Sequence, residues 1–136
     1  MPVERSAGIV IFRNTAEGRK YLVIRSSRDK STIVKGKDVK EFWDFSKGVL
    51  EKGETGLDAA KREAKEEVGI EDLEIIPGFK ETIFYFTRRD GKSVPKYVAM
   101  FVAETKTEKI KLSWEHDKYE WLSYEGARER ITLKQM

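Results

Sequence analysis

Residues 48–70 have the sequence GVLEKGETGLDAAKREAKEEVGI, and this stretch predicts a helix with an unusual concentration of acid near its end. Thr55 followed by Asp58 resembles a capping box, although Asp stands where Glu or Gln is usual. Gly69 is a typical C-terminal stop, so we expect the helix over residues 56–68. At about 100° per residue, the apolar side chains fall on one stripe: Leu57, Ala60, Ala64 and Val68. The two alanines would allow the helix to approach a sheet closely.

Three carboxylates, Glu63, Glu66 and Glu67, share one arc of roughly 100° beside that stripe. Like charges three or four residues apart destabilise a helix by roughly 0.2–0.5 kcal/mol per pair. Carboxylates near a helix C-terminus also oppose the helix dipole, by roughly 0.3–1 kcal/mol each. A hard divalent cation would offset this repulsion, and Mg²⁺ binds through carboxylates, water and phosphate oxygens. The triplet alone leaves an exposed acidic face as an equal alternative.

Composition limits the class of protein. A chain of 136 residues can form a single domain over 1–136 with a real core. It lacks an apolar run of about eighteen residues and a secretory-signal pattern at its start, so we expect a cytoplasmic protein without membrane association. The absence of cysteine excludes disulfides and thiolate chemistry, and the single histidine, His116, excludes a zinc site built on several histidines. A net charge of +3 is compatible with anionic partners but is explained equally well by a solvated surface.

The remaining pattern predicts strands around the helix. We expect them at residues 7–12, 21–25, 73–76, 81–87, 97–104 and 119–122. Polar residues 13–20 indicate a hairpin, and an Asp-Gly turn falls within 88–92. The continuous apolar run 97–103 favours a central strand, and residues 124–133 predict a second helix. The Lys-rich segment 26–41 is either a long loop over a site or a solvated excursion. This pattern alone indicates an α/β or α+β fold.

The spacing within the first stretch matches the signature of the Nudix hydrolases, G-x5-E-x7-R-E-U-x-E-E-x-G-U, where U is apolar. All its fixed positions are filled: Gly48, Glu54, Arg62, Glu63, Glu66, Glu67, Gly69 and the apolar positions Ala64 and Ile70. The resemblance implies an α/β/α sandwich around a central mixed β-sheet. It also implies hydrolysis of a nucleoside diphosphate linked to another moiety.

The same resemblance implies roles for the matched residues. Glu63 and Glu67 match regular ligands of the divalent cation, which would be Mg²⁺, with Mn²⁺ as an alternative. Glu66 matches a further ligand or a base, and the Gly48 carbonyl often completes the coordination. All three glutamates are therefore candidate catalytic residues, and the identity of the general base stays open. Glu54 and Arg62 match a pair that braces the loop against the helix.

Two further segments are similar to asymmetrical diadenosine tetraphosphate hydrolases within this family. WDFSKG (43–48) resembles their W-D-F-P-K-G, with Ser46 in place of proline, which predicts a looser start of the loop. By this resemblance Lys47 would contact phosphate, Tyr85 would stack on adenine, and Lys96 would hold a distal phosphate. Solvated lysines and a core tyrosine are the plain alternatives.

The second segment, LSWEHDKYEWLSYEGA (112–127), is similar to their S-x-E-H-x-x-Y-x-W-L. Tyr119 is the next candidate for stacking, and His116 is a candidate phosphate contact. Glu104 and Glu115 are candidates for an extra metal ligand or base. The tryptophans are interpreted as core aromatics: Trp43, Trp114 and Trp121.

These features favour a Mg²⁺-dependent Nudix pyrophosphohydrolase that cleaves dinucleoside polyphosphates, such as diadenosine tetraphosphate to ATP and AMP. Cleanup of noncanonical nucleoside triphosphates and removal of pyrophosphate from an RNA 5′ end share the same motif and are the alternatives. The RNA end is the one nucleic-acid partner considered. A catalytically silent nucleotide-binding module normally lacks one of the motif carboxylates, and this chain has all of them. The sequence gives no sign of oligomeric state.

Overall fold

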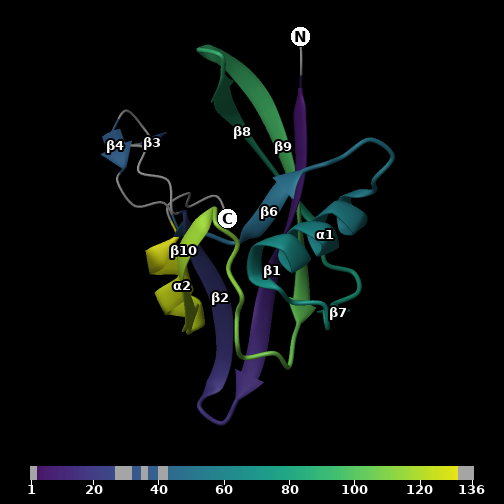
Figure 1. Ribbon diagram of the computed structural model, residues 1–136, viewed down its shortest axis with the longest axis vertical. Helices are drawn as coiled ribbons and strands as arrows, with labels where there is room; N and C mark the ends of the chain where they lie inside the picture. Colours follow the sequence, from purple (N-terminus) through teal and green to yellow (C-terminus); the bar gives the residue numbers. More distant parts are fainter. Residues whose placement is uncertain (1–2, 27–31, 35–36, 40–42, 132–136) are drawn as a thin grey trace.

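The computed structural model describes residues 3–26, 32–34, 37–39 and 43–131, and it is built around one mixed sheet (Figure 1). Eight described strands form this sheet in the order β10-β2-β1-β9-β7, with β5 on β2, β6 on β1 and β8 on β9. Its long strands are β1 (Glu4–Thr15), β2 (Gly18–Ser26), β8 (Glu81–Arg89), β9 (Lys92–Glu104) and β10 (His116–Leu122). Its short strands are β5 (Trp43–Asp44), β6 (Ser46–Val49) and β7 (Glu74–Ile75). β3 (Thr32–Val34) and β4 (Lys37–Val39) form a separate two-stranded sheet.

β1 and β9 form the centre of the sheet. They run parallel, with a register from Glu4 opposite Lys96 to Phe12 opposite Glu104. Because successive side chains of a strand alternate between faces, β1 contributes Ala7, Ile9 and Ile11 to one core cluster. Residues of β9 on the other face pack with Trp43 and Phe45 in a second cluster. The continuous apolar run therefore forms a central strand, as predicted.

The two helices cover opposite faces of the sheet. α1 (Gly56–Val68) packs in the cluster that contains Ala7, whereas α2 (Tyr124–Arg130) contributes to the cluster that contains Trp43 (Figure 1). This arrangement confirms the predicted α/β/α sandwich with a mixed sheet. Neither of these described helices has the length and apolar character needed to cross a bilayer.

Local signals set both ends of α1. The Thr55 hydroxyl accepts a hydrogen bond from the Asp58 amide at 3.1 Å, and the Asp58 carboxylate accepts one from the Thr55 amide at 3.4 Å. Gly69 ends the helix in the left-handed region, at φ 73°, where glycine has no steric penalty. The predicted bounds of 56–68 are confirmed.

The buried face of α1 differs from the prediction in two places. Leu57 is only partly buried, whereas Ala59 is fully buried together with Ala60, Ala64 and Val68. Glu67 also belongs to the buried face instead of lying beside it. Small side chains thus bring the helix close enough to the sheet to enclose a carboxylate.

Several predicted bounds need correction. β1, β9 and β10 are longer than expected because their neighbours continue the pairing. β7 is shorter than the predicted strand 73–76: it has two residues and is soon followed by Pro77. α2 ends at Arg130, since Ile131 is extended, and residues 132–133 lie outside the described part of the chain. Within segment 26–41, Ser26 ends β2 and the other described residues form β3 and β4. The rest of the segment, and with it the prediction of a loop over the site, lies outside the described part of the chain. Trp114 is 79% exposed and is not a core residue.

Asp72 holds the chain as it leaves β9. Its carboxylate accepts hydrogen bonds from the Thr105 hydroxyl at 2.6 Å, the Thr107 hydroxyl at 2.7 Å and the Lys106 amide at 2.9 Å. Thr105 is buried, so Asp72→Ala would leave its hydroxyl without this partner. We expect the free energy of unfolding at pH 7 to fall by about 1–3 kcal/mol, measured by urea denaturation.

The pH dependence of this loss checks its cause. Burial acts to raise the pKa of Asp72, but the three hydrogen bonds outweigh it and hold the pKa below its usual value. The stabilisation is therefore complete above about pH 4, the range of an unfolded Asp, and disappears as the pH falls through the lower folded pKa. Asp72→Asn, which keeps one acceptor oxygen, should lose less than Asp72→Ala. An equal difference from wild type at every pH would contradict this account.

Candidate active site

Gly48 and Glu63 meet where β6 passes α1. β6 pairs with β1, which places Gly48 opposite Ala7 on the helix-covered face. A Cβ atom on Gly48 would lie 2.1 Å from Cδ of Glu63 and 2.3 Å from its Oε1. The Glu63 carboxylate can therefore lie directly against the β6 backbone only because residue 48 has no side chain.

Glu67 is the buried carboxylate of the site, with 7% of its surface exposed. Its Oε1 accepts hydrogen bonds from the Ser46 hydroxyl at 2.8 Å and the Lys47 amide at 3.1 Å. Burial raises the pKa of Glu67 to about 8; these hydrogen bonds oppose the shift, and the charges of Glu63 and Asp44 add to it. The structure corrects the prediction of a looser loop start, because Ser46 is buried and provides a bond that proline lacks.

Arg62 connects the other two carboxylates with the preceding loop. Its guanidinium donates two hydrogen bonds to Glu54, from Nε at 2.7 Å and from Nη2 at 3.0 Å. Its Nη1 donates to Glu63 and to Glu66, each at 2.9 Å, and Nη2 also donates to the Val49 carbonyl at 3.0 Å. Glu54 and Arg62 thus lie between loop and helix, where the resemblance places them. The Arg62 charge also offsets the repulsion between Glu63 and Glu66.

The chemistry of this cluster fits a hard divalent cation. Carboxylate oxygens and a backbone carbonyl are suitable ligands for Mg²⁺, and the missing side chain of Gly48 lets the Glu63 carboxylate lie against the β6 backbone, next to the Gly48 carbonyl. Among the described residues, no three acidic or imidazole side chains are already grouped as a metal site. The reason is visible in their partners: Glu63 and Glu66 accept from Arg62, and Glu67 accepts from β6. These hydrogen bonds to Glu63 and Glu67 each end on Oε1.

Lys47 connects the carboxylate cluster with Tyr85, which lies on β8 of the β8–β9 hairpin. Its ammonium lies 2.7 Å from Oδ2 of Asp44 and donates to the Tyr85 hydroxyl at 3.1 Å. Burial acts to lower the pKa of Lys47, but Asp44 and Tyr85 outweigh it and the pKa is raised. Lys47 is therefore a fixed cation next to Gly48, although its side chain is only 14% exposed.

Tyr85 lies between two lysines. The ammonium groups of Lys47 and Lys96 are 5.4 Å and 5.7 Å from the centroid of its ring. Lys96 and Lys47 therefore both contact Tyr85, and the predicted contact of each lysine with phosphate stays a prediction. A base that stacks on the same face of Tyr85 would compete with these cation–π contacts.

Glu115 and His116 approach the site where β10 begins. The Ser113 amide donates to the Glu67 carbonyl at 3.1 Å, and the charge of Glu115 acts on Glu63. Burial lowers the pKa of His116 against the opposing charges of Glu115, Asp44 and Asp117. Its Nδ1 is buried and has no hydrogen-bond partner among the described residues.

Two predicted site residues lie elsewhere. Glu104 is opposite Phe12 in the register, whereas Gly48 is opposite Ala7, so they lie about 17 Å apart along β1. The Glu104 carboxylate accepts from Asn14 at 3.2 Å, and we withdraw it as a metal ligand. Tyr119 lines a pocket of about 450 Å³ with Trp43 and neighbouring residues. The described lining of that pocket includes none of the three motif carboxylates.

Sequence reasoning missed Asp44 as the partner of Lys47 and Ser46 as a partner of Glu67. The signal for Asp44 was its place three residues before a lysine within an aromatic segment, which permits an ion pair. The signal for Ser46 was its replacement of a proline, which adds a hydroxyl beside the motif. Neither signal identifies its partner without the three-dimensional structure.

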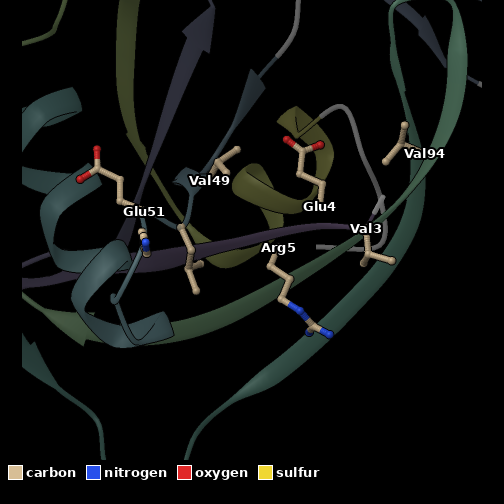
Figure 2. Close-up of a pocket in the computed structure, with 8 residues that line it drawn as sticks. Val3, Glu4, Arg5, Val49, Glu51 and Val94 are labelled. Atoms are coloured by element: carbon tan, nitrogen blue, oxygen red, sulfur yellow. The ribbon is translucent and has the colours of Figure 1, made fainter. Parts of the chain in front are cut away.

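A separate pocket adjoins the loop after β6. It has a volume of about 540 Å³ and is lined by Val3, Glu4, Arg5, Val49, Leu50, Glu51, Lys52 and Val94. Figure 2 shows side chains from the start of β1 on one side and Val49 and Glu51 on the other. Glu63, Glu66 and Glu67 are not part of its lining, so we place the chemistry at the carboxylate cluster and not in this pocket.

Comparison with known proteins agrees with this geometry. The sequence model of the NUDIX domain matches residues 2–135. A bis(5′-nucleosyl)-tetraphosphatase [asymmetrical] of Mus musculus is 36% identical over 140 residues, covering 97% of this chain and 87% of the relative. An RNA pyrophosphohydrolase of Nitratiruptor sp. is 29% identical over 105 residues, covering 71% of this chain and 68% of the relative. A crystal structure of a C. elegans Ap4A hydrolase binary complex has a TM-score of 0.76 at 32% identity, with 93% and 85% of the two chains covered.

Proposed function

Since this chain belongs to the Nudix family of hydrolases, which act on phosphoanhydride bonds, we propose that it cleaves dinucleoside polyphosphates with the help of Mg²⁺. Diadenosine tetraphosphate is the proposed type of substrate, and ATP and AMP are the proposed products. The observation that carries this proposal is the contact between β6 and α1. It sets the backbone amide of Lys47 against the Glu67 carboxylate and the bare backbone of Gly48 against the Glu63 carboxylate, while the Lys47 ammonium is held beside them by Asp44 and Tyr85.

The residues of this contact have complementary roles. Glu63, Glu66, Glu67 and the Gly48 carbonyl would hold the divalent cation, for which Mn²⁺ is an alternative. The bound cation would neutralise phosphate oxygens, orient the substrate and activate a water molecule. Lys47 and Lys96 bind the phosphate chain from the other side, and Nδ1 of His116 donates to it.

Glu66 is the proposed general base. Its side chain is 53% exposed, so it can reach a water molecule at the surface of the site. Glu67 is buried and engaged with β6, which makes it better suited to hold a cation than to exchange protons with solvent. The carboxylate of Glu66 would accept the proton of the attacking water while Lys47 and Lys96 hold the leaving phosphates.

Relatives support this substrate over an RNA 5′ end. The tetraphosphatase of Mus musculus matches 97% of the chain, whereas the RNA pyrophosphohydrolase of Nitratiruptor sp. matches 71%. The lysines around Tyr85 also suit a long phosphate chain. Cleanup of noncanonical triphosphates shares the motif and is retained as an arm of the test.

Incubation of the protein with Mg²⁺ and diadenosine tetraphosphate should release ATP and AMP in equal amounts, as measured by chromatography. The same assay should include modified nucleoside triphosphates and triphosphorylated RNA, each compared by kcat/KM. Release of ADP as the sole product would contradict asymmetric cleavage. Faster turnover of a mononucleotide or of RNA would overturn the choice of substrate.

A further inference from the structure

Trp114 is an exposed tryptophan at the edge of the carboxylate cluster. It occupies a tight turn from Ser113 to His116, closed by a hydrogen bond of 3.1 Å from the His116 amide to the Ser113 carbonyl. Its 79% exposure is higher than that of the other exposed large apolar side chains described. A packed tryptophan buries roughly 150–250 Å², so burial in the core does not explain this position.

The turn is fixed to the end of α1 that carries the carboxylates. The Lys111 amide donates to the Val68 carbonyl at 3.0 Å, and the Ser113 amide donates to the Glu67 carbonyl at 3.1 Å. On the other side of Trp114, the charge of Glu115 acts on Glu63. The indole is therefore attached to a turn that is bonded to the backbone of α1 at Glu67 and contains Glu115, whose charge acts on Glu63.

We propose that Trp114 is a stacking surface for one nucleobase of the substrate. This inference rests on the proposed function and names a residue that selects nucleotides over simple polyphosphates. A base linked to a phosphate at the carboxylates lies within one nucleotide of this turn. Aromatic side chains stack on any base, because every base has a flat π-face. Trp114 thus favours bases in general and discriminates weakly between adenine and guanine.

Kinetics of Trp114 variants provide the first test. Trp114→Ala should raise KM by roughly 5–150-fold, the equivalent of one lost base–aromatic stack, with little change in kcat. Trp114→Phe should restore most of the affinity. Tyr124→Ala is the matched control, because Tyr124 is a 58% exposed aromatic residue on α2, and its KM should equal that of wild type. An unchanged KM in Trp114→Ala would overturn the proposal.

Intrinsic fluorescence of the intact protein with Mg²⁺ and ATP, a proposed product, provides the second test, and it does not depend on turnover of a dinucleotide. Trp114 is far more exposed than Trp43, which is buried, and than Trp121, which is partly buried, so its emission can be followed at the red edge of the spectrum. ATP should quench this emission, and Trp114→Phe should lack the quenched component. Inorganic tripolyphosphate, which has no base, should leave it unchanged. Equal quenching by both ligands, or quenching by neither, would overturn the proposal.

The two tests separate this inference from the proposed function. If the protein hydrolyses another nucleotide faster than diadenosine tetraphosphate, the substrate choice fails. The same KM and fluorescence measurements on that nucleotide still decide the role of Trp114. If diadenosine tetraphosphate is the substrate but Trp114→Ala binds it as wild type does, the inference fails alone.

Discussion

Replacing Glu67 by Gln is expected to abolish Mg²⁺-dependent turnover while the protein remains folded. Gln keeps the shape of the side chain and an oxygen that accepts from Ser46 and from the Lys47 amide. It removes the negative charge that would hold the cation at the buried end of the site. We expect kcat to fall by at least about 10²–10³-fold, the usual cost of one preorganised electrostatic group. Near-normal turnover in Glu67→Gln would refute the metal assignment.

Thermal unfolding in EDTA provides the matching control. Because the folded pKa of Glu67 is about 8 and an unfolded Glu titrates near about 4.3, the folded state binds the proton more tightly. Ionisation of Glu67 therefore reduces wild-type stability as the pH rises between these two values. Gln does not ionise, so the variant should be more stable than wild type at pH 8 and equal to it near pH 4. Loss of structure in Glu67→Gln at pH 7 would instead show that the carboxylate is required for folding.

Helix α1 was predictable because its signals are local. Thr55, Asp58 and Gly69 each act within one turn of the helix, so their effect does not depend on the rest of the fold. The central position of β9 was also predictable, because a strand buried on both faces has to be apolar throughout. The resemblance then supplied the α/β/α arrangement, which periodicity alone did not distinguish from other α/β or α+β folds.

Errors arose where a conclusion depended on register or on distant partners. Glu104 was a candidate ligand until the parallel pairing of β1 and β9 placed it opposite Phe12. Trp114 was interpreted as a core residue because it is apolar. Its position in a turn, where its side chain is exposed, became visible only in the structure. The pairing of Lys47 with Tyr85 joins residues 38 positions apart, and only the folded sheet brings them together.

The crowded acids of α1 illustrate how local rules and tertiary structure combine. Local electrostatics disfavours Glu63, Glu66 and Glu67 near a helix end, which left a bound cation and an exposed acidic face as equal explanations until the motif spacing favoured a site. The structure adds two other partners, since Arg62 bridges Glu63 and Glu66 while β6 satisfies Glu67. Arg62 and β6 therefore offset in the fold part of the repulsion that local rules assign to these acids.

Substitution of Gly48 by Ala is expected to reduce turnover by at least about 10²-fold, because a misplacement of catalytic groups by about 1 Å has a cost of that size. The new methyl group would lie 2.1 Å from Cδ of Glu63, so the carboxylate has to leave its position. Glu63 is flexible at that end and φ of Gly48 is not in the positive range. Stability should therefore fall by only about 1 kcal/mol, the worth of one hydrogen bond.

Gly56→Ala is the matched control for this prediction. A methyl group on Gly56 would find its nearest atom at 3.6 Å, on Phe101, which is ordinary contact. Turnover should stay at the wild-type level, and stability should stay equal or rise, because alanine in a helix reduces the entropy of the unfolded chain. A titration of activity with Mg²⁺ should need a higher concentration for Gly48→Ala alone. Wild-type turnover in Gly48→Ala would show that Glu63 acts without its contact to the β6 backbone, and the cation site would then have to be built on Glu66 and Glu67.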